Sequence, residues 1–206
     1  MMSKVRWFVL GLLSCAVLAL VAGVTVAHRA QGFSTREPPT YLEQWLARAA
    51  RSAAVPSAAK VRPNPVPDTP DVIAEARAHW ADHCALCHAN DGSGETEMGR
   101  QMYPPAPDMR KPSTQRMTDG ELFFIIQNGI RLTGMPAWGT GSSNDEEASW
   151  KLVRFIRHLP QLTMDERKQM EKLNPKGPDD RLEEEQEEKF LRGEGSDAPP
   201  TEHHHH

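Results

Sequence analysis

Two cysteines and a histidine lie together in "CALCH", Cys84 to His88, in a chain of 206 residues that has only three cysteines. Two residues separate Cys84 from Cys87, and His88 follows directly. This spacing is compatible with a disulfide, a zinc site, a redox dithiol or the covalent attachment of a haem. The surrounding sequence discriminates among these four chemistries.

A covalent haem fits the spacing best. Two thiols on one helical turn can each form a thioether with a vinyl group of a porphyrin, and the next residue then places an imidazole beside the iron. The sequence therefore predicts one haem c, covalently attached through Cys84 and Cys87, with His88 as an axial ligand.

The other three chemistries lack supporting residues. A zinc site needs about four ligands, but no second CxxC or HxxxH follows, and His83 and His88 directly adjoin the cysteines. A thioredoxin-like dithiol belongs in a βαβ pattern, which is absent from the sequence. A disulfide between such close cysteines would constrain little of the chain. Cys15 lies in an apolar run and is most simply a small hydrophobic residue.

A second axial ligand is expected from the methionines, of which the chain has nine. Met135 stands in "TGMPAWG", on a predicted loop that Pro136 stiffens. Four other methionines also lie in predicted loops and are expected to pack rather than to bind: Met98, Met102, Met109 and Met117. His79 and His158 are poorly placed to reach the far face of the haem.

Three helical patterns surround these residues. They cover residues 71–84, 118–129 and 145–160, and apolar residues recur on one side of the first and the third. Thr118 and Glu121 form a predicted capping box at the start of the second helix. Loops rich in glycine and proline connect the helices, and no alternating strand pattern is present, so the fold class is predicted to be all-α.

An apolar segment precedes this region. Residues 7–27 carry no charge, and about 20 such residues suffice to cross a bilayer as a helix. A retained transmembrane anchor over residues 1–30 is favoured over a cleaved signal peptide. Residues 31–70 are predicted to be a tether with a short amphipathic helix, which could contact the membrane, a partner or its own domain. "VRPNPVPDTP", residues 61–70, is predicted to be a semi-rigid spacer that lets the domain swing.

The end of the chain is charged. The net charge is only −4, with −6 in residues 161–202 and about +2 in the rest, and it gives no reason to expect nucleic-acid binding. We predict that this segment is largely disordered, with a possible docking role for the acidic run 183–188. The four terminal histidines, 203–206, could be native or a tag, and no function is assigned to them.

Residues 71–160 resemble a class I, monohaem c-type cytochrome. The resemblance rests on five features: "CALCH", Trp80 before it, the glycine-containing loop "ANDGSGE", the segment "NGIRLTGMPAWG", and the terminal helix "WKLVRFIRHL". The family often has glycine where this chain has Ala76, which implies a slightly wider helix crossing. The resemblance implies a cytochrome c fold, with three to four helices around one haem, behind an N-terminal transmembrane helix.

The resemblance also assigns roles to individual residues. Cys84 and Cys87 would carry the thioethers, and His88 and Met135 would be the axial ligands. The carbonyl of Pro104 or Pro105 would accept the proton of His88. Tyr103, Trp138 and Arg110 would contact the haem or its propionates.

The predicted function is one-electron, outer-sphere transfer by a membrane-tethered carrier. With both axial positions filled, no small-molecule substrate is expected to bind. Thioether attachment normally occurs on the exported side, so the domain is expected on the periplasmic side of a bacterial inner membrane, with redox proteins or a respiratory enzyme complex as partners. Two alternatives stay open: a fixed cytochrome c subunit of a membrane dehydrogenase or terminal oxidase, and a haem enzyme or gas sensor whose distal side is open.

Overall fold

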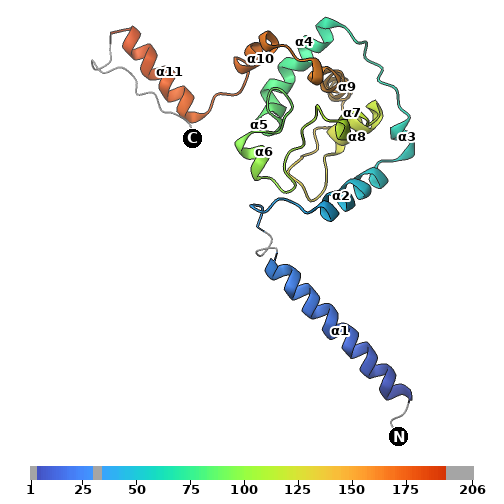
Figure 1. Ribbon diagram of the computed structural model, residues 1–206. Helices are drawn as coiled ribbons and strands as arrows, with labels where there is room; N and C mark the ends of the chain where they lie inside the picture. Colours follow the sequence, from blue (N-terminus) through green and yellow to red (C-terminus); the bar gives the residue numbers. More distant parts are fainter. Residues whose placement is uncertain (1–3, 30–33, 194–206) are drawn as a thin grey trace.

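The computed structural model describes residues 4–29 and 34–193, and the regular secondary structure within these ranges consists of helices joined by loops (Figure 1). The all-α prediction is therefore confirmed. The terminal histidines lie outside the described residues. The α-helices are α1 (Lys4–Arg29), α2 (Tyr41–Ala54), α3 (Ser57–Lys60), α4 (Pro70–His79), α5 (Ala85–His88), α6 (Glu97–Gln101), α7 (Pro112–Gln115), α8 (Asp119–Asn128), α9 (Ser143–His158), α10 (Met164–Glu171) and α11 (Pro178–Leu191).

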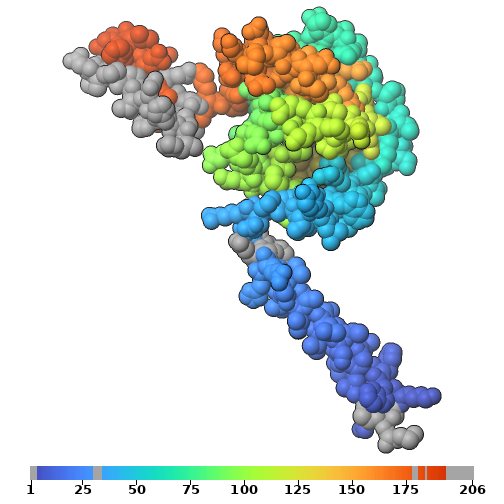
Figure 2. Space-filling view, viewed as in Figure 1, coloured from blue at the N-terminus to red at the C-terminus, as the bar shows by residue number. Residues whose placement is uncertain are grey.

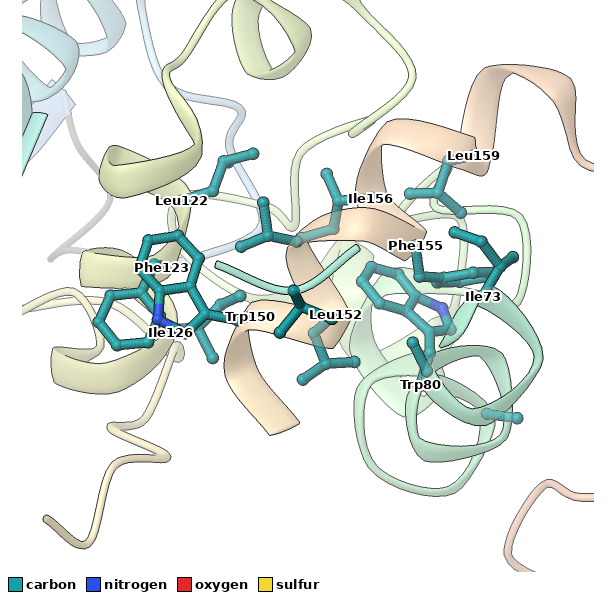
Figure 3. Packing of buried hydrophobic residues seen from close by; sticks show 14 of the residues in the cluster. Ile73, Trp80, Leu122, Phe123, Ile126, Trp150, Leu152, Phe155, Ile156 and Leu159 are labelled. Atoms are coloured by element: carbon teal, nitrogen blue, oxygen red, sulfur yellow. The ribbon is translucent and has the colours of Figure 1, made fainter. Parts of the chain in front are cut away.

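The core forms where α4 packs against α9 (Figure 3). Trp80, which follows α4, lies against Phe155 of α9 with ring centroids 5.5 Å apart. Ala76, at the position where the family often has glycine, is buried in the same cluster. Helix α9 presents its apolar residues at a helical spacing, so one face of it is buried along most of its length.

Helix α8 extends this core on its other side. Thr118 accepts a hydrogen bond from the Glu121 backbone, and the Glu121 side chain accepts one from the backbone of Thr118, so the predicted capping box is present. Phe123 stacks on Trp150 of α9 with ring centroids 4.0 Å apart. The helix ends at Gly129, which has a φ of 65°.

The segment predicted to be a swinging spacer is instead bound to the domain. The Asn64 side chain donates to the carbonyl of Trp150 (3.0 Å), and the Arg154 guanidinium donates to the carbonyl of Val66 (2.6 and 2.9 Å). Val66 is buried in the core. Proline keeps residues 61–69 out of a helix, but it leaves their carbonyls free to accept hydrogen bonds from α9. The prediction of a free spacer here is therefore wrong.

The packed region also continues beyond the predicted boundary at Pro160. Helix α10 contributes Met170, which is fully buried in the core. The Arg77 guanidinium of α4 pairs with the Glu166 carboxylate at 2.9 Å. Charged residues dominate α10, so its single core contact was not visible in the sequence pattern.

The two ends of the described chain lie apart from this domain. Helix α1 has no buried residue and is long and apolar enough to cross a membrane, as a signal sequence near an N-terminus also can be. Helix α11, which contains the acidic run, extends away on another side (Figure 1).

Candidate functional site

A change of helix type positions Cys84. Helix α4 passes into a π-helical turn, Trp80–Cys84, and α5 then carries Cys87 and His88. Such π-turns occur often at functional sites. The buried Trp80 indole donates to the carbonyl of Ala89 at 2.9 Å, and its ring lies 5.7 Å from the His88 ring. Trp80 thereby ties the His88 end of the CxxCH turn to the core.

The residue after His88 has an unusual backbone conformation. Ala89 has φ 59° and ψ 161°, a region that residues other than glycine rarely adopt because of Cβ contacts. The next N–H groups turn back toward the helix: Gly92 donates to the carbonyl of Ala89 and Gly94 to that of His88. The chain therefore leaves α5 abruptly, directly after the candidate ligand.

The reactive side chains are held in neutral form. Burial, with a smaller effect of Cys87, raises the pKa of Cys84 to about 12, and burial also raises the pKa of Cys87. Burial lowers the pKa of His88 to about 4. At neutral pH His88 is therefore an uncharged imidazole, the form that binds a metal. Both cysteines are free thiols, as thioether formation requires.

The expected acceptor for His88 is not observed. Its Nδ1 atom is buried and has no hydrogen-bond partner among the described residues, and Pro104 and Pro105 are both exposed. Instead, the carbonyls of Ala106 and Pro107 lie against Gly94. The loop therefore approaches the attachment turn only after the two predicted prolines. There the N–H of Ala106 donates to the carbonyl of Gly99 at 2.9 Å.

Helix α6 supports the attachment turn from outside, which the sequence analysis missed. The Thr96 hydroxyl donates to the carbonyl of Cys87 (3.2 Å) and accepts from the N–H of Gly99 (2.8 Å). A Cβ at Gly99 would collide with the same Cys87 carbonyl. A threonine three residues before a glycine was the available signal, but it is too common to identify such a contact.

The loop that carries Met135 folds back along the end of α8. Ile130 donates to the carbonyl of Met135 at 3.1 Å, and Trp138 donates to the carbonyl of Ile126 at 3.1 Å. The Trp138 ring then lies edge-on to His83, with centroids 5.6 Å apart. Trp138 therefore joins the Met135 loop to the π-helical turn that carries Cys84.

A second thioether lies beside this loop. Gly134 is the residue before Met135, and a Cβ atom added to it would lie only 2.6 Å from the sulfur of Met102. By contrast, Met109 and Met117 pack against the core, and Met98 is exposed. Among the competing methionines, Met102 is thus the one that contacts the Met135 loop.

Two of the predicted haem contacts have other partners in the structure. All three guanidinium nitrogens of Arg110 are hydrogen-bonded to Asp91 or Asp108, at 2.9 to 3.1 Å. The Tyr103 hydroxyl lies beside the Glu43 carboxylate of α2. Because these polar groups are paired, the expectation that they bind the propionates receives no support, and both residues fasten loops instead.

The donor set fits a haem better than a metal ion alone. No group of three or more His, Cys, Asp or Glu side chains able to hold a metal ion occurs within residues 4–29 and 34–193. Two free thiols and a neutral imidazole share one helical turn, and a methionine loop is joined to that turn through Trp138. This is the set that covalent haem attachment needs.

Comparison with known proteins agrees with this geometry. The family model described as "Cytochrome C oxidase, cbb3-type, subunit III" matches residues 71–156. A search of curated proteins found no match. The matched segment begins at the start of α4 and ends within α9, so it contains the attachment turn and the Met135 loop. Residues 71–156 are therefore a c-type cytochrome domain, and with its apolar N-terminal helix the chain fits a membrane-anchored cytochrome c.

Proposed function

We propose that the protein is a membrane-tethered electron carrier that moves one electron at a time through a covalently bound haem c. The observation that carries this proposal is the placement of Cys84, Cys87 and His88 on one turn within a cytochrome c domain. When bound, the haem would supply a reversible one-electron couple for outer-sphere transfer.

The residues of the chain have distinct tasks in this proposal. Cys84 and Cys87 hold the haem by thioethers. His88 would supply a nitrogen ligand to the iron and Met135 a sulfur ligand, and a thioether ligand would favour the reduced state and leave no place for a substrate. Trp80 and Trp138 keep the two ligand segments in place through the contacts described above. Because both ligands stay bound, little rearrangement accompanies each transfer.

The bound position of residues 61–70 changes how the tether is expected to work. Asn64 and Val66 are fixed to α9, so this segment belongs to the domain while those contacts hold. The part of the tether outside the domain is then shorter than residues 31–70. The carrier is expected to act close to the membrane rather than at the end of a long spacer.

The compartment follows from the chemistry of attachment. Haem c is normally attached on the exported side of a membrane, so we place the domain on the periplasmic side of a bacterial inner membrane. Helix α1 then serves as a retained single-pass anchor. Partners would be other redox proteins or a respiratory enzyme complex, bound through a small transient interface near the cysteines.

The family description favours a second candidate, a fixed subunit of a terminal oxidase. The haem site would be the same in both cases, so the two functions differ only in assembly. Membranes solubilised in mild detergent and separated by size distinguish them. A carrier is expected to migrate as a small haem-containing species, whereas a fixed subunit is expected to remain with a larger enzyme.

The site itself is tested by spectra of the purified full chain. The reduced protein is expected to show a sharp α band, to exchange single electrons with small redox mediators, and not to bind carbon monoxide at neutral pH. Carbon monoxide binding to the native reduced protein would contradict the carrier proposal and would favour a haem enzyme or gas sensor with an open distal side.

A further inference from the structure

Helix α2 presents its two faces in the opposite way to most surface helices. Its polar side faces the domain: Gln44 and Arg51 are partly buried, and the Glu43 carboxylate lies beside the Tyr103 hydroxyl of the loop 102–110. Its apolar side faces outward, where Leu42 is 65%, Trp45 63% and Leu46 51% exposed. Amphipathic helices of globular domains normally bury the apolar stripe against the core.

This orientation is held by the contacts that follow the helix. The start of α2 is closed by its own capping box between Thr40 and Glu43. After the end, Val55 is buried, and Lys60 of α3 donates to the carbonyl of Ser52 at 2.7 Å. The apolar face therefore cannot turn toward the domain without breaking these contacts, and it needs another apolar environment.

The position of α2 in the chain identifies that environment. Helix α1 ends at Arg29 and α2 begins at Tyr41. The connecting residues, at about 3.5 Å each, span roughly 40 Å at most. If α1 crosses the bilayer, α2 is held near the membrane surface. In Figures 1 and 2, α2 lies on the side of the domain from which α1 extends.

The residue types on α2 also match a membrane interface. Tyr41 and Trp45 lie on the outward side, and aromatic residues of this kind gather at headgroup depth. Arg48 is exposed beside the apolar face and can reach lipid phosphates with its long side chain. A helix with leucine and tryptophan on one side and arginine on the other is typical of segments that lie in the plane of the interface.

We propose that α2 is an interfacial helix that seats the haem domain on the membrane, with Leu42, Trp45 and Leu46 inserted between lipid headgroups. This rests on the proposed role of α1 as a retained anchor. The Glu43 carboxylate lies beside Tyr103, in the loop 102–110 that reaches the attachment turn at Ala106. Lipid contact would therefore hold the haem site at a fixed height and orientation above the bilayer.

Spin labels on the full-length holoprotein in phospholipid nanodiscs containing anionic lipid test this proposal. On a Cys15→Ser background, a label is attached to Leu46→Cys, and Ala47→Cys serves as the matched control on the other side of α2. Both positions are exposed, so the fold should tolerate them, and the haem spectrum verifies this. We expect the ratio of collisions with oxygen to collisions with a water-soluble nickel chelate to be several-fold higher at position 46 than at position 47.

Two results would overturn the proposal: equal ratios at both positions, which means that the face is in water, or protection of position 46 from both reagents, which means that protein covers it. A label on native Cys15, in an otherwise unchanged chain, reports on the anchor separately. If Cys15 lies in the bilayer and position 46 does not, only the proposal for α2 fails. If Cys15 lies in water, the anchor and this proposal are both wrong.

Discussion

At the scale of single residues, the distal ligand depends on which of two neighbouring thioethers reaches the iron. Met135 is carried by a loop hydrogen-bonded to the end of α8, through Ile130 and Trp138. Met102 touches the same loop at Gly134. The backbone bonds of the Met135 loop restrict its position before any ligand binds, which favours Met135 because less conformational entropy is lost on ligation.

Replacing Met135 by alanine tests this assignment directly. Met135→Ala is expected to abolish the weak sulfur-to-iron band in the far red of the oxidised spectrum and to let the reduced protein bind carbon monoxide. Met102→Ala is the matched control and should keep the band and exclude carbon monoxide. The reverse pattern would make Met102 the ligand.

The backbone of Ala89 gives a prediction for stability. Its φ of 59° and ψ of 161° cost about 1–3 kcal/mol for a residue with a Cβ. Ala89→Gly removes that cost. The glycine also makes the unfolded chain more flexible, which lowers the stability by about 0.4–1 kcal/mol. We therefore expect the free energy of unfolding to rise by roughly 1 kcal/mol in denaturant titrations.

A control for Ala89 is available one turn earlier. Ala85 is buried in helical conformation, so Ala85→Gly should lower the free energy of unfolding, by about 0.5–1 kcal/mol from backbone entropy alone. If Ala89→Gly destabilised the protein as much as Ala85→Gly does, the conformation at Ala89 would not be strained.

At the same scale, the sequence predicted the positions of site residues on one helical turn better than the positions of site residues on loops. The placement of Cys84, Cys87 and His88 on one turn follows from local spacing. The expected partners Pro104, Pro105 and Arg110 depended on where a long loop runs, and that is decided by contacts such as those of Gly94 with Ala106. Such contacts join residues far apart in sequence, and no local pattern reports them.

At the scale of elements, α10 completes the domain although its sequence looks like a charged tail. Its contribution is one buried methionine, Met170, together with Glu166, which bonds to Arg77 and His158 at 2.9 Å each. A helix with a single apolar anchor has too weak a pattern to be recognised from sequence. The capping box at Thr118 shows the opposite case, in which the signal is local and the prediction was confirmed.

Truncating Met170 measures how much α10 contributes. Met170→Ala should lower the free energy of unfolding by about 2–4 kcal/mol, because it leaves a cavity in the core. Met164→Ala, in the same helix but exposed, is expected to change it by less than about 0.5 kcal/mol. Equal effects of the two substitutions would show that α10 does not pack as described.

Glu166 makes the docking of α10 sensitive to acid. Burial would raise the pKa of Glu166, but hydrogen bonds from Thr163 and the charge and hydrogen bond of His158 hold it below its ordinary value of 4.5. Because the folded pKa is depressed, this stabilisation is present above pH 4.5 and is lost as the pH falls through the folded pKa.

Denaturant titrations between pH 7 and pH 3 check this linkage. The wild type should lose more stability below about pH 4.5 than Glu166→Gln does, since the glutamine cannot be protonated in this range. Parallel stability curves for the two proteins would show that Glu166 is not the linked group.

At the scale of the whole molecule, residues 61–70 pack onto the c-type cytochrome domain that follows them and form part of it. Four prolines in residues 61–70 indicated an extended chain correctly, but composition does not say whether an extended chain is free or bound. The hydrogen bonds from Asn64 and Arg154 decide that question. Helix α1 was predictable because its length and apolar composition are sufficient by themselves.

The most direct test of the account is whether the full chain, produced in a host that attaches haem c, carries a haem bonded to Cys84 and Cys87. The intact mass is expected to exceed that of the polypeptide by one haem, and the colour should stay with the protein in acidified organic solvent. The mass of the bare polypeptide, or colour that passes into the solvent, would contradict it.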